Sequence, residues 1–372
     1  FFPKQTGRAD WEKGEIKLYC NQVFVSDSIK EVVPRYLLPL RGVLDSPDIP
    51  LNVSRSALQT DRRVRSIGQF VSKKVADKLR DLKKDNPNQY AEAWDALAPF
   101  VKIGAMEDDK FSEQVSDLIL FQTTAKIEEN EDLLEGNGRT YTTISSYRTR
   151  QTSESQKRIL YCTDEIAQAG ALSLWKSQGA EVLFAETVLD SQFIPWLESK
   201  EHELTFQRVD SELDSSLQDD QPEISDQEGE TKSESLRTLI KKALNNDKIT
   251  VQVQSLKGGA DAPAALILLP EQMRRMNDIG ALMEQRLPGL PDYHVLLVNR
   301  QHPLVEALLN LESGSVVIAD GATSPSHQLA VDLAQHLYDL ARLAVNGLEP
   351  AELGQFQSRA TLLMSSLLRR GA

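Results

Sequence analysis

The sequence predicts an α/β (α+β) multidomain protein, and three observations lead to this prediction. At 372 residues, 40% of them hydrophobic, the chain is too long for a single core of usual size. Apolar residues recur every three or four positions over 63–125 and again near the C-terminus, which is typical of amphipathic helices. At 157–209, short apolar runs alternate with helical stretches, as expected for a parallel sheet covered by helices.

The first elements lead into a turn-rich segment with an arginine after it. Residues 17–25 are predicted to form a strand and 28–40 a short helix plus loop. The proline- and aspartate-rich stretch 45–50 restricts the backbone, Asn52 or Ser54 can cap the following helix, and Arg55 falls in its first turn. A cation opposes the dipole of its own helix there, so Arg55 and the free backbone N–H groups make a site that attracts phosphate or carboxylate. The alternative, which sequence physics alone favours, is a solvated arginine in a satisfied loop.

Three consecutive helices are expected next, as a small coil or bundle. Asn86-Pro87 ends the first, and Gly104 together with the acidic stretch 107–109 separates the second from the third. Their apolar positions are Val64, Ile67, Val71, Val75, Leu79 and Leu82, then Tyr90, Trp94 and Leu97, then Phe111, Val115 and Leu118.

The small α/β unit comprises strands at 159–162, 181–185 and 204–209, with helices at 165–178 and 190–199 between them. Residues 210–234 contain ten acidic residues and one basic residue, and almost no apolar ones. We interpret them as a solvated linker without a partner that marks a domain boundary.

Residues 235–372 open with a helix, followed by strands near 249–255 and 264–269 and a methionine-bearing helix. Met273, Met276 and Met283 either fill a core or form a surface that accepts many apolar shapes. Two terminal helices follow, separated by a break at 346–350. They either pack on their own domain or form a hairpin that binds a partner, through Leu329, Leu333, Leu337, Leu340, Leu343, Phe356, Leu363, Leu367 and Leu368.

Composition excludes several classes of function. With 42 basic and 55 acidic side chains the formal charge is −13, which argues against nucleic acid as a partner. Cys20 and Cys162 lie in apolar runs and are expected to be reduced core thiols, and no metal site is expected around His302 or the other histidines. The apolar run 264–269 is far shorter than the roughly 18 residues of a membrane span. We therefore expect a cytoplasmic protein, and we find neither a P-loop nor a G-x-G-x-x-G motif.

Several motifs resemble the ninety-kilodalton heat-shock chaperone family, in its bacterial form. The similarity rests on 17–25, Pro34-Arg-Tyr-Leu37, Arg41-Gly-Val-Leu-Asp-Ser-Pro-Asp-Ile-Pro-Leu-Asn-Val-Ser-Arg55 with Leu58-Gln59, 156–161 and 299–304. It covers nearly the whole chain, weakly at about 125–155 and 210–234. The end of the chain has no acidic pentapeptide tail.

The resemblance implies a middle domain at 1–209 that lacks its beginning, the linker, and a C-terminal dimerisation domain at 235–372. In such a chaperone Arg55 would contact the γ-phosphate of ATP, with Asn52 and Gln59 around it. ATP and Mg²⁺ would be bound by an upstream nucleotide-binding domain and not by this fragment, which would be inactive as an ATPase on its own. Ser56 and Ala57 depart from the acidic and bulkier residues that the family commonly has there.

The resemblance also implies partners. Met273 and Met276 would contact non-native client proteins, and the terminal helices would form an isologous four-helix bundle in a homodimer, with possible co-chaperones elsewhere. Two alternatives remain open: an ATP-independent dimeric holdase or scaffold, and an unrelated α/β enzyme that uses Arg55 to bind an acidic substrate. The second would need a general base, which the sequence does not reveal.

Overall fold

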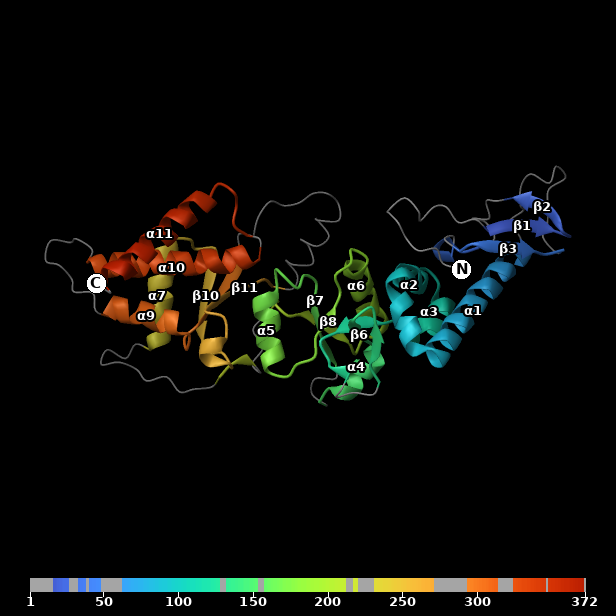
Figure 1. Cartoon of the computed structure of the whole chain (residues 1–372), viewed down its shortest axis with the longest axis horizontal. Helices are drawn as coiled ribbons and strands as arrows, with labels where there is room; N and C mark the ends of the chain where they lie inside the picture. The colour runs from blue at the N-terminus through green and yellow to red at the C-terminus, as the bar shows by residue number, and fades with distance from the viewer. Residues whose placement is uncertain are drawn as a thin grey trace. The chain divides into compact units, whose positions relative to one another are not determined.

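The computed structural model describes residues 16–26, 33–37, 40–47, 62–127, 132–152, 157–211, 217–219, 231–270, 293–313, 324–345 and 347–370 (Figure 1). At 62–65 and 367–370 the description covers the backbone alone. The chain forms two compact units, 1–157 with 192–204, and 158–191 with 205–372. The small α/β unit therefore groups largely with the C-terminal residues, whereas the resemblance assigned it to the middle domain.

The first unit opens with a three-stranded sheet in the order β2-β1-β3. β1 (Ile16–Cys20) pairs antiparallel with β2 (Val23–Ser26) and parallel with β3 (Gly42–Asp45). The single strand predicted at 17–25 is wrong, because Asn21 and Gln22 both have positive φ, 52° and 65°, and turn the chain into a hairpin. Asn-Gln lacks the glycine that usually marks such a turn, so the sequence pattern did not reveal it.

The three predicted helices are confirmed as α1 (Arg62–Asp85), α2 (Pro87–Glu107) and α3 (Asp109–Val115), which continues into η3 (Ser116–Leu118). Asp108 caps α3 by accepting hydrogen bonds from the backbone N–H groups of Lys110 and Phe111. Gly104 does not separate two helices, because it lies inside α2. A Cβ there would come within 2.7 Å of the rings of Phe111 and Tyr36, so glycine permits close packing at this point.

The stretch where the resemblance is weakest also has ordered structure in the first unit. It contains β4 (Phe121–Thr123), β5 (Leu134–Gly136), β6 (Arg139–Thr142) and α4 (Ile144–Arg150). β6 pairs antiparallel with both β4 and β5. A Cβ at Gly136 would lie 2.5 Å from the backbone of α2, so β5 packs directly against that helix.

The small α/β unit is confirmed as a parallel arrangement. β7 (Arg158–Cys162) pairs with β8 (Leu183–Phe184) on one side and with β9 (Thr205–Arg208) on the other, with α5 (Ala169–Ser177) and α6 (Asp190–Lys200) in the connections. α5 begins later than predicted, because the Asp164 carboxylate caps a turn at Ile166 and Ala167 first. β7 and α5 share a core with β11 and β12 of the C-terminal region, through Leu160, Trp175, Leu268 and Leu297.

The C-terminal part is built on a mixed sheet in the order β10-β12-β11. The strands are β10 (Ile249–Gln254), β11 (Ala265–Leu268) and β12 (His294–Asn299), and the short η6 (Gly259–Asp261) precedes β11. The helices are α7 (Lys232–Leu244), α9 (Pro303–Ser313), α10 (Pro325–Ala344) and α11 (Leu353–Arg370). Apolar residues of α7, α9 and α10 form one core with this sheet.

Both cysteines are free, as expected, but only one of them is a core thiol. Cys162 is buried, and burial raises the pKa of its thiol to about 12, which keeps it protonated and unreactive, whereas Cys20 is only partly buried. None of the helices in the described part of the chain has the length and apolar character needed to cross a membrane.

Candidate functional site

The predicted arginine segment lies between two described flanks. Asn52, Arg55 and Gln59 themselves fall outside the described residues, which end at Ser46-Pro47 and resume at α1. The leading flank is fixed in the sheet, because the backbone N–H of Ser46 donates to the carbonyl of Tyr19 over 3.1 Å. The Asp45 carboxylate also accepts from the backbone N–H of Gln22, at 3.1 and 3.3 Å. The chain therefore enters the arginine segment from the end of β3, which these hydrogen bonds hold in place.

A buried hydroxyl cluster joins the short helix that precedes β3 to α1 and to the start of α3. Tyr36, in η2 (Arg35–Leu37), is 3% exposed, and its hydroxyl lies 3.0 Å from Oγ of Ser72 on α1 and 3.2 Å from Oδ2 of Asp108. The Ser72 hydroxyl donates to the carbonyl of Gly68 at 3.0 Å. The tyrosine is neutral, because burial is the main factor that raises its pKa and the Asp108 charge raises it further.

The trailing flank is strongly basic. α1 contains nine lysines or arginines and three aspartates, in a chain whose overall charge is −13. Lys73, Lys74 and Lys78 are exposed on this helix. These exposed lysines give α1, the helix that follows the arginine segment in the sequence, a positive surface that attracts anions.

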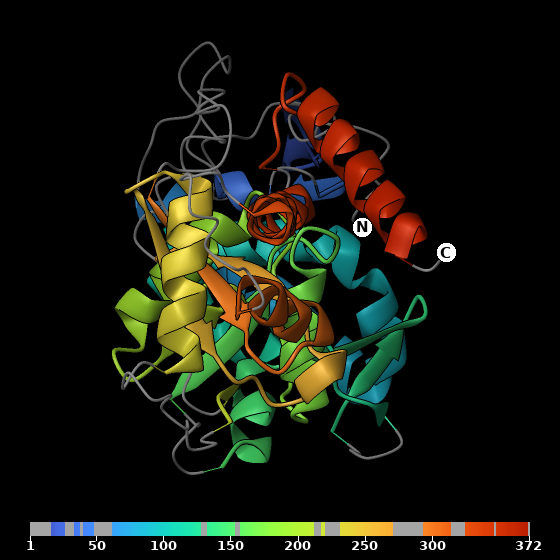
Figure 2. The ribbon, with the colours of Figure 1, turned by 90° about the vertical axis from the view of Figure 1, so that its left-hand side faces the viewer.

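The terminal helices keep part of their apolar surface exposed. Leu340 and Leu343 on α10 are 42% and 44% exposed, and Leu362 and Met364 on α11 are more exposed still. Figure 2 looks nearly along α10, and α11 runs obliquely to one side of it, so the two helices are not parallel. Phe356 and Arg359, in the N-terminal half of α11, contact α10.

The residues predicted for a dimer interface therefore differ in how deeply they are buried within this chain. Leu337 is 3% exposed and belongs to the core formed with α7, α9 and the sheet, so this residue packs within its own domain. Leu329, Leu333, Phe356 and Leu363 are partly buried, and Leu340 is exposed. Leu367 lies on α11, but its side chain is outside the described part.

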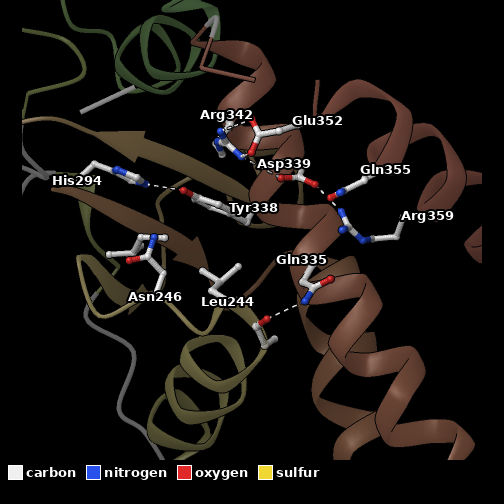
Figure 3. A pocket seen from close by; sticks show the side chains of 12 residues that line it. Leu244, Asn246, His294, Gln335, Tyr338, Asp339, Arg342, Glu352, Gln355 and Arg359 are labelled. Carbon is white, nitrogen blue, oxygen red and sulfur yellow. Dashed lines mark hydrogen bonds and ion pairs between the residues drawn. The ribbon is translucent and has the colours of Figure 1, made fainter. Parts of the chain in front are cut away.

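A polar pocket of about 440 Å³ lies where α10, α11, the end of α7 and β12 meet (Figure 3). Arg342 forms a bidentate pair with Glu352 at 2.6 and 2.9 Å, and Asp339 pairs with both Arg342 and Arg359. His294 and Tyr338 share a hydrogen bond of 2.9 Å. The two arginines and two carboxylates neutralise one another, so the cluster holds α11 on α10 and offers no free charge for catalysis.

Local pKa values follow from these contacts. The hydrogen bond from Arg342 is the main factor that lowers the pKa of Glu352, while burial raises the pKa of Tyr338 to about 12. Burial, and then the charge of Arg359, lower the pKa of His336 on α10. The His336 ring stacks on the Phe356 ring, with 4.7 Å between the ring centroids.

The other predicted sites add no functional group within the part of the chain that the structure describes. Met273 and Met276 lie outside the described residues. Within the described ranges, no group of three or more His, Cys, Asp or Glu side chains is placed to hold a metal ion. Neither the Tyr36 cluster nor the ion pairs between α10 and the residues of α11 and the turn before it were predicted from the sequence, since both join different elements of the chain. The acidic stretch at 107–109 was the one local signal, because it marked the start of α3.

Comparison with known proteins identifies the family to which this chain is similar. The family model described as Hsp90 protein matches residues 2–371. The chain is 35% identical over 330 residues to the chaperone protein HtpG of Porphyromonas gingivalis, covering 85% of this chain and 46% of that protein. It is 33% identical to HtpG of Bacteroides fragilis strain YCH46, covering 83% of this chain and 45% of that protein, and 29% identical to HtpG of Roseobacter denitrificans, covering 96% and 55%.

The chain spans about half the length of the curated relatives it matches. The match runs through the β3 and α1 flanks, the small α/β unit and the terminal helices. By the extent of this match, the chain belongs to the Hsp90 family.

Proposed function

We propose that this chain is the middle and C-terminal part of an ATP-dependent molecular chaperone. In this proposal Arg55 contacts the γ-phosphate of ATP held, with Mg²⁺, by a separate nucleotide-binding domain, and Asn52 and Gln59 orient the arginine or the attacking water. The fragment itself binds neither ATP nor Mg²⁺ and has no ATPase activity alone. The observation that carries the proposal is the family match over residues 2–371, which includes the arginine segment.

Physical chemistry supports the role of Arg55. A planar guanidinium forms bidentate hydrogen bonds with phosphate oxygens, and an arginine that reaches the transferring phosphoryl group stabilises the charge that develops on it. The position before α1 and the basic surface of that helix favour an anionic ligand. A deep nucleotide pocket in this chain is not required, because the arginine acts on ATP held elsewhere.

The rest of the proposal concerns partners. Met273 and Met276 contact non-native client proteins, and the protein forms a homodimer through α10 and α11, where Leu340 and Leu343 expose apolar surface. Co-chaperones bind elsewhere, and the protein works in the cytoplasm. Neither nucleic acid nor a membrane span takes part.

The test is steady-state ATP hydrolysis by the protein that contains this segment together with its nucleotide-binding domain. We expect Arg55→Ala to lower turnover by about tenfold or more, because one charge-stabilising donor is lost, while the affinity for ATP is unchanged. The matched control is Lys73→Ala, which removes one positive charge from an exposed position on α1. Lys73→Ala should leave turnover within about twofold of the unmodified protein.

Unchanged turnover in Arg55→Ala would overturn the catalytic role. If suppression of client aggregation then persisted with or without ATP, the protein would be an ATP-independent dimeric holdase. Turnover of a phosphate or carboxylate substrate by the isolated fragment would instead indicate an unrelated enzyme.

A further inference from the structure

We infer that residues 217–219 of the acidic linker form an anchor that couples β7 and α5 to the C-terminal sheet. The expectation of a solvated linker without a partner at 210–234 is wrong for these three residues, because both their backbone and their side chains have partners. All the elements involved belong to one compact unit. The inference goes beyond the proposed function, because it involves neither Arg55 nor ATP.

The backbone of the anchor pairs with the turn that follows β10. An isolated antiparallel bridge centred on Gln218 joins the two segments. The N–H of Asp219 donates to the carbonyl of Ser255 at 2.8 Å, and the N–H of Lys257 donates to the carbonyl of Leu217 at 3.0 Å. These two hydrogen bonds fix the backbone of the anchor against the turn.

Leu217 places its side chain in a core that two parts of the chain share. This side chain is 2% exposed. The same core contains Leu172 and Trp175 of α5 together with Leu268 and Leu297 of the C-terminal sheet. Burial of the leucine stabilises the contact between α5 and the sheet, because its apolar surface is removed from water only while both remain in place.

The carboxylate of Asp219 is bound by Gln301, which follows β12. The side-chain Nε2 of Gln301 donates to Oδ2 of Asp219 at 2.9 Å. Gln301 is itself held by the fully buried Asn299, whose Oδ1 accepts the backbone N–H of Gln301 at 3.2 Å. Because a charged acceptor strengthens a hydrogen bond, Asp219 adds a directional contact to the apolar one.

The motif at 299–304, which the sequence singled out, also shapes the turn that receives the anchor. Nδ2 of Asn299 donates to the carbonyl of Gly259 at 2.8 Å. The guanidinium of Arg300 donates to Oγ of Ser255 at 2.7 and 3.1 Å. The motif therefore holds the turn on both sides and supplies the donor for the carboxylate of the anchor.

The start and the end of the linker are attached as well. The carbonyl of Asp210 accepts the N–H of Leu269, next to β11, at 3.2 Å. Thr231 caps α7 through reciprocal hydrogen bonds with Glu234. With the anchor between them, the linker is fixed at three points to one compact unit. A movement of β7 and α5 is therefore transmitted to the C-terminal sheet through packed side chains instead of being absorbed by the linker.

The test is amide hydrogen exchange in the parent protein, with Leu217→Asp as the variant that breaks the anchor. A carboxylate is too costly to bury in the shared core, so residues 217–219 should leave the turn. We expect exchange at 255–257 and in α5, at 171–177, to become at least about tenfold faster, because both lose the same contact. The matched control is Val188→Asp, the same kind of change at a side chain that is 61% exposed, which should leave both regions within about twofold.

A milder variant keeps the test decisive if Leu217→Asp does not fold. Asp219→Ala removes the charged acceptor and keeps the apolar contact, so exchange at 255–257 should become about threefold faster or more. Gln301→Ala should have the same effect, and the two changes together should add little, because both remove one hydrogen bond. The control is Asp261→Ala, on η6, whose exposed carboxylate makes no hydrogen bond or ion pair with the described residues.

Faster exchange at 255–257 with unchanged exchange in α5 would overturn the coupling, because the anchor would then be a local attachment. Equal effects of Leu217→Asp and Val188→Asp would overturn it too, since both would reflect a general loss of stability. Additive effects of Asp219→Ala and Gln301→Ala would show that this hydrogen bond does not hold the anchor. Hydrolysis by Arg55→Ala is measured separately, so failure of the anchor and failure of the proposed function are distinguishable.

Discussion

At the scale of single residues, Arg208 and Asp210 form a nearly buried ion pair at the end of β9. The two side chains are 9% and 8% exposed and are joined by hydrogen bonds of 2.6 and 2.8 Å, and Arg208 also donates to the Thr163 hydroxyl. A buried charge without its partner is far more costly than the intact pair is stabilising. Each member therefore requires the other.

We predict that Asp210→Ala lowers the free energy of unfolding by about 3 kcal/mol, because Arg208 is left with an uncompensated buried charge. Urea unfolding followed by circular dichroism measures this. Asp247→Ala, which removes a carboxylate from an exposed turn, is the control and should change stability by less than about 0.5 kcal/mol. A loss below about 1 kcal/mol in Asp210→Ala would mean that water reaches the guanidinium.

At the scale of elements, α11 is attached to α10 by polar contacts more than by apolar packing. Glu352 and Arg359 form ion pairs with residues of α10, and Phe356 stacks on His336. Among the described residues, Nδ1 of His336 is buried without a hydrogen-bond partner. The charged groups near this imidazole are Arg359 on α11 and Asp339 on α10, and Asp339 is already shared by two arginines.

This arrangement predicts a pH dependence of α11 docking. The pKa of His336 in the docked state is below its ordinary value of 6.5, so an undocked α11 leaves an imidazole that binds a proton more readily. The docked state is thus fully stable above pH 6.5 and loses stability as the pH falls below it. Because the pKa of Glu352 is also lowered, its pair with Arg342 stays ionised in this range.

Amide hydrogen exchange of residues 353–366 at pH 7.5 and pH 5.8, corrected for the intrinsic rates, measures this dependence. We expect faster corrected exchange at the lower pH. In His336→Phe, which keeps an aromatic ring against Phe356 and cannot be protonated, the difference should disappear. A difference that persists in His336→Phe would assign the titration to another group.

At the scale of the whole molecule, the proposed homodimer requires a surface that a second copy can cover. Leu340 and Leu343 on α10, with Leu362 and Met364 on α11, are exposed apolar residues close to the end of the chain. Burial of such a face between two copies is the usual way in which helical hairpins form isologous interfaces. Leu337, one turn before Leu340, points into its own core and stabilises the protomer instead.

We predict that Leu340→Glu shifts the protein from dimer to monomer at micromolar concentration, because two copies of the charge would be buried at the interface. Sedimentation equilibrium measures the shift. The control is Ile166→Glu, the same kind of change at a side chain that is 88% exposed on the turn before α5. A dimer that survives Leu340→Glu but is lost in Ile166→Glu would move the interface to that turn.

The parts of the fold that could be predicted from the sequence are those that depend on residues close together in the chain. The helices of 63–125 and the parallel strands of 157–209 follow from apolar periodicity, which is local, and the structure confirms them. The hairpin at Asn21-Gln22 and the position of Gly104 inside α2 were mispredicted. Both depend on backbone conformation and packing partners that neighbouring sequence does not determine.

For the candidate site, long motifs in register were sufficient to assign the family, and with it the predictions for Asn52, Arg55 and Gln59. These residues stay predictions, as do Met273 and Met276. Only the tertiary structure revealed that Tyr36, Ser72 and Asp108 meet, and that Leu337 is buried whereas Leu340 is not. The physical reason is that a motif records which residues are present, whereas a hydrogen bond across 36 or 72 residues, or burial within a core, exists only once the chain has folded.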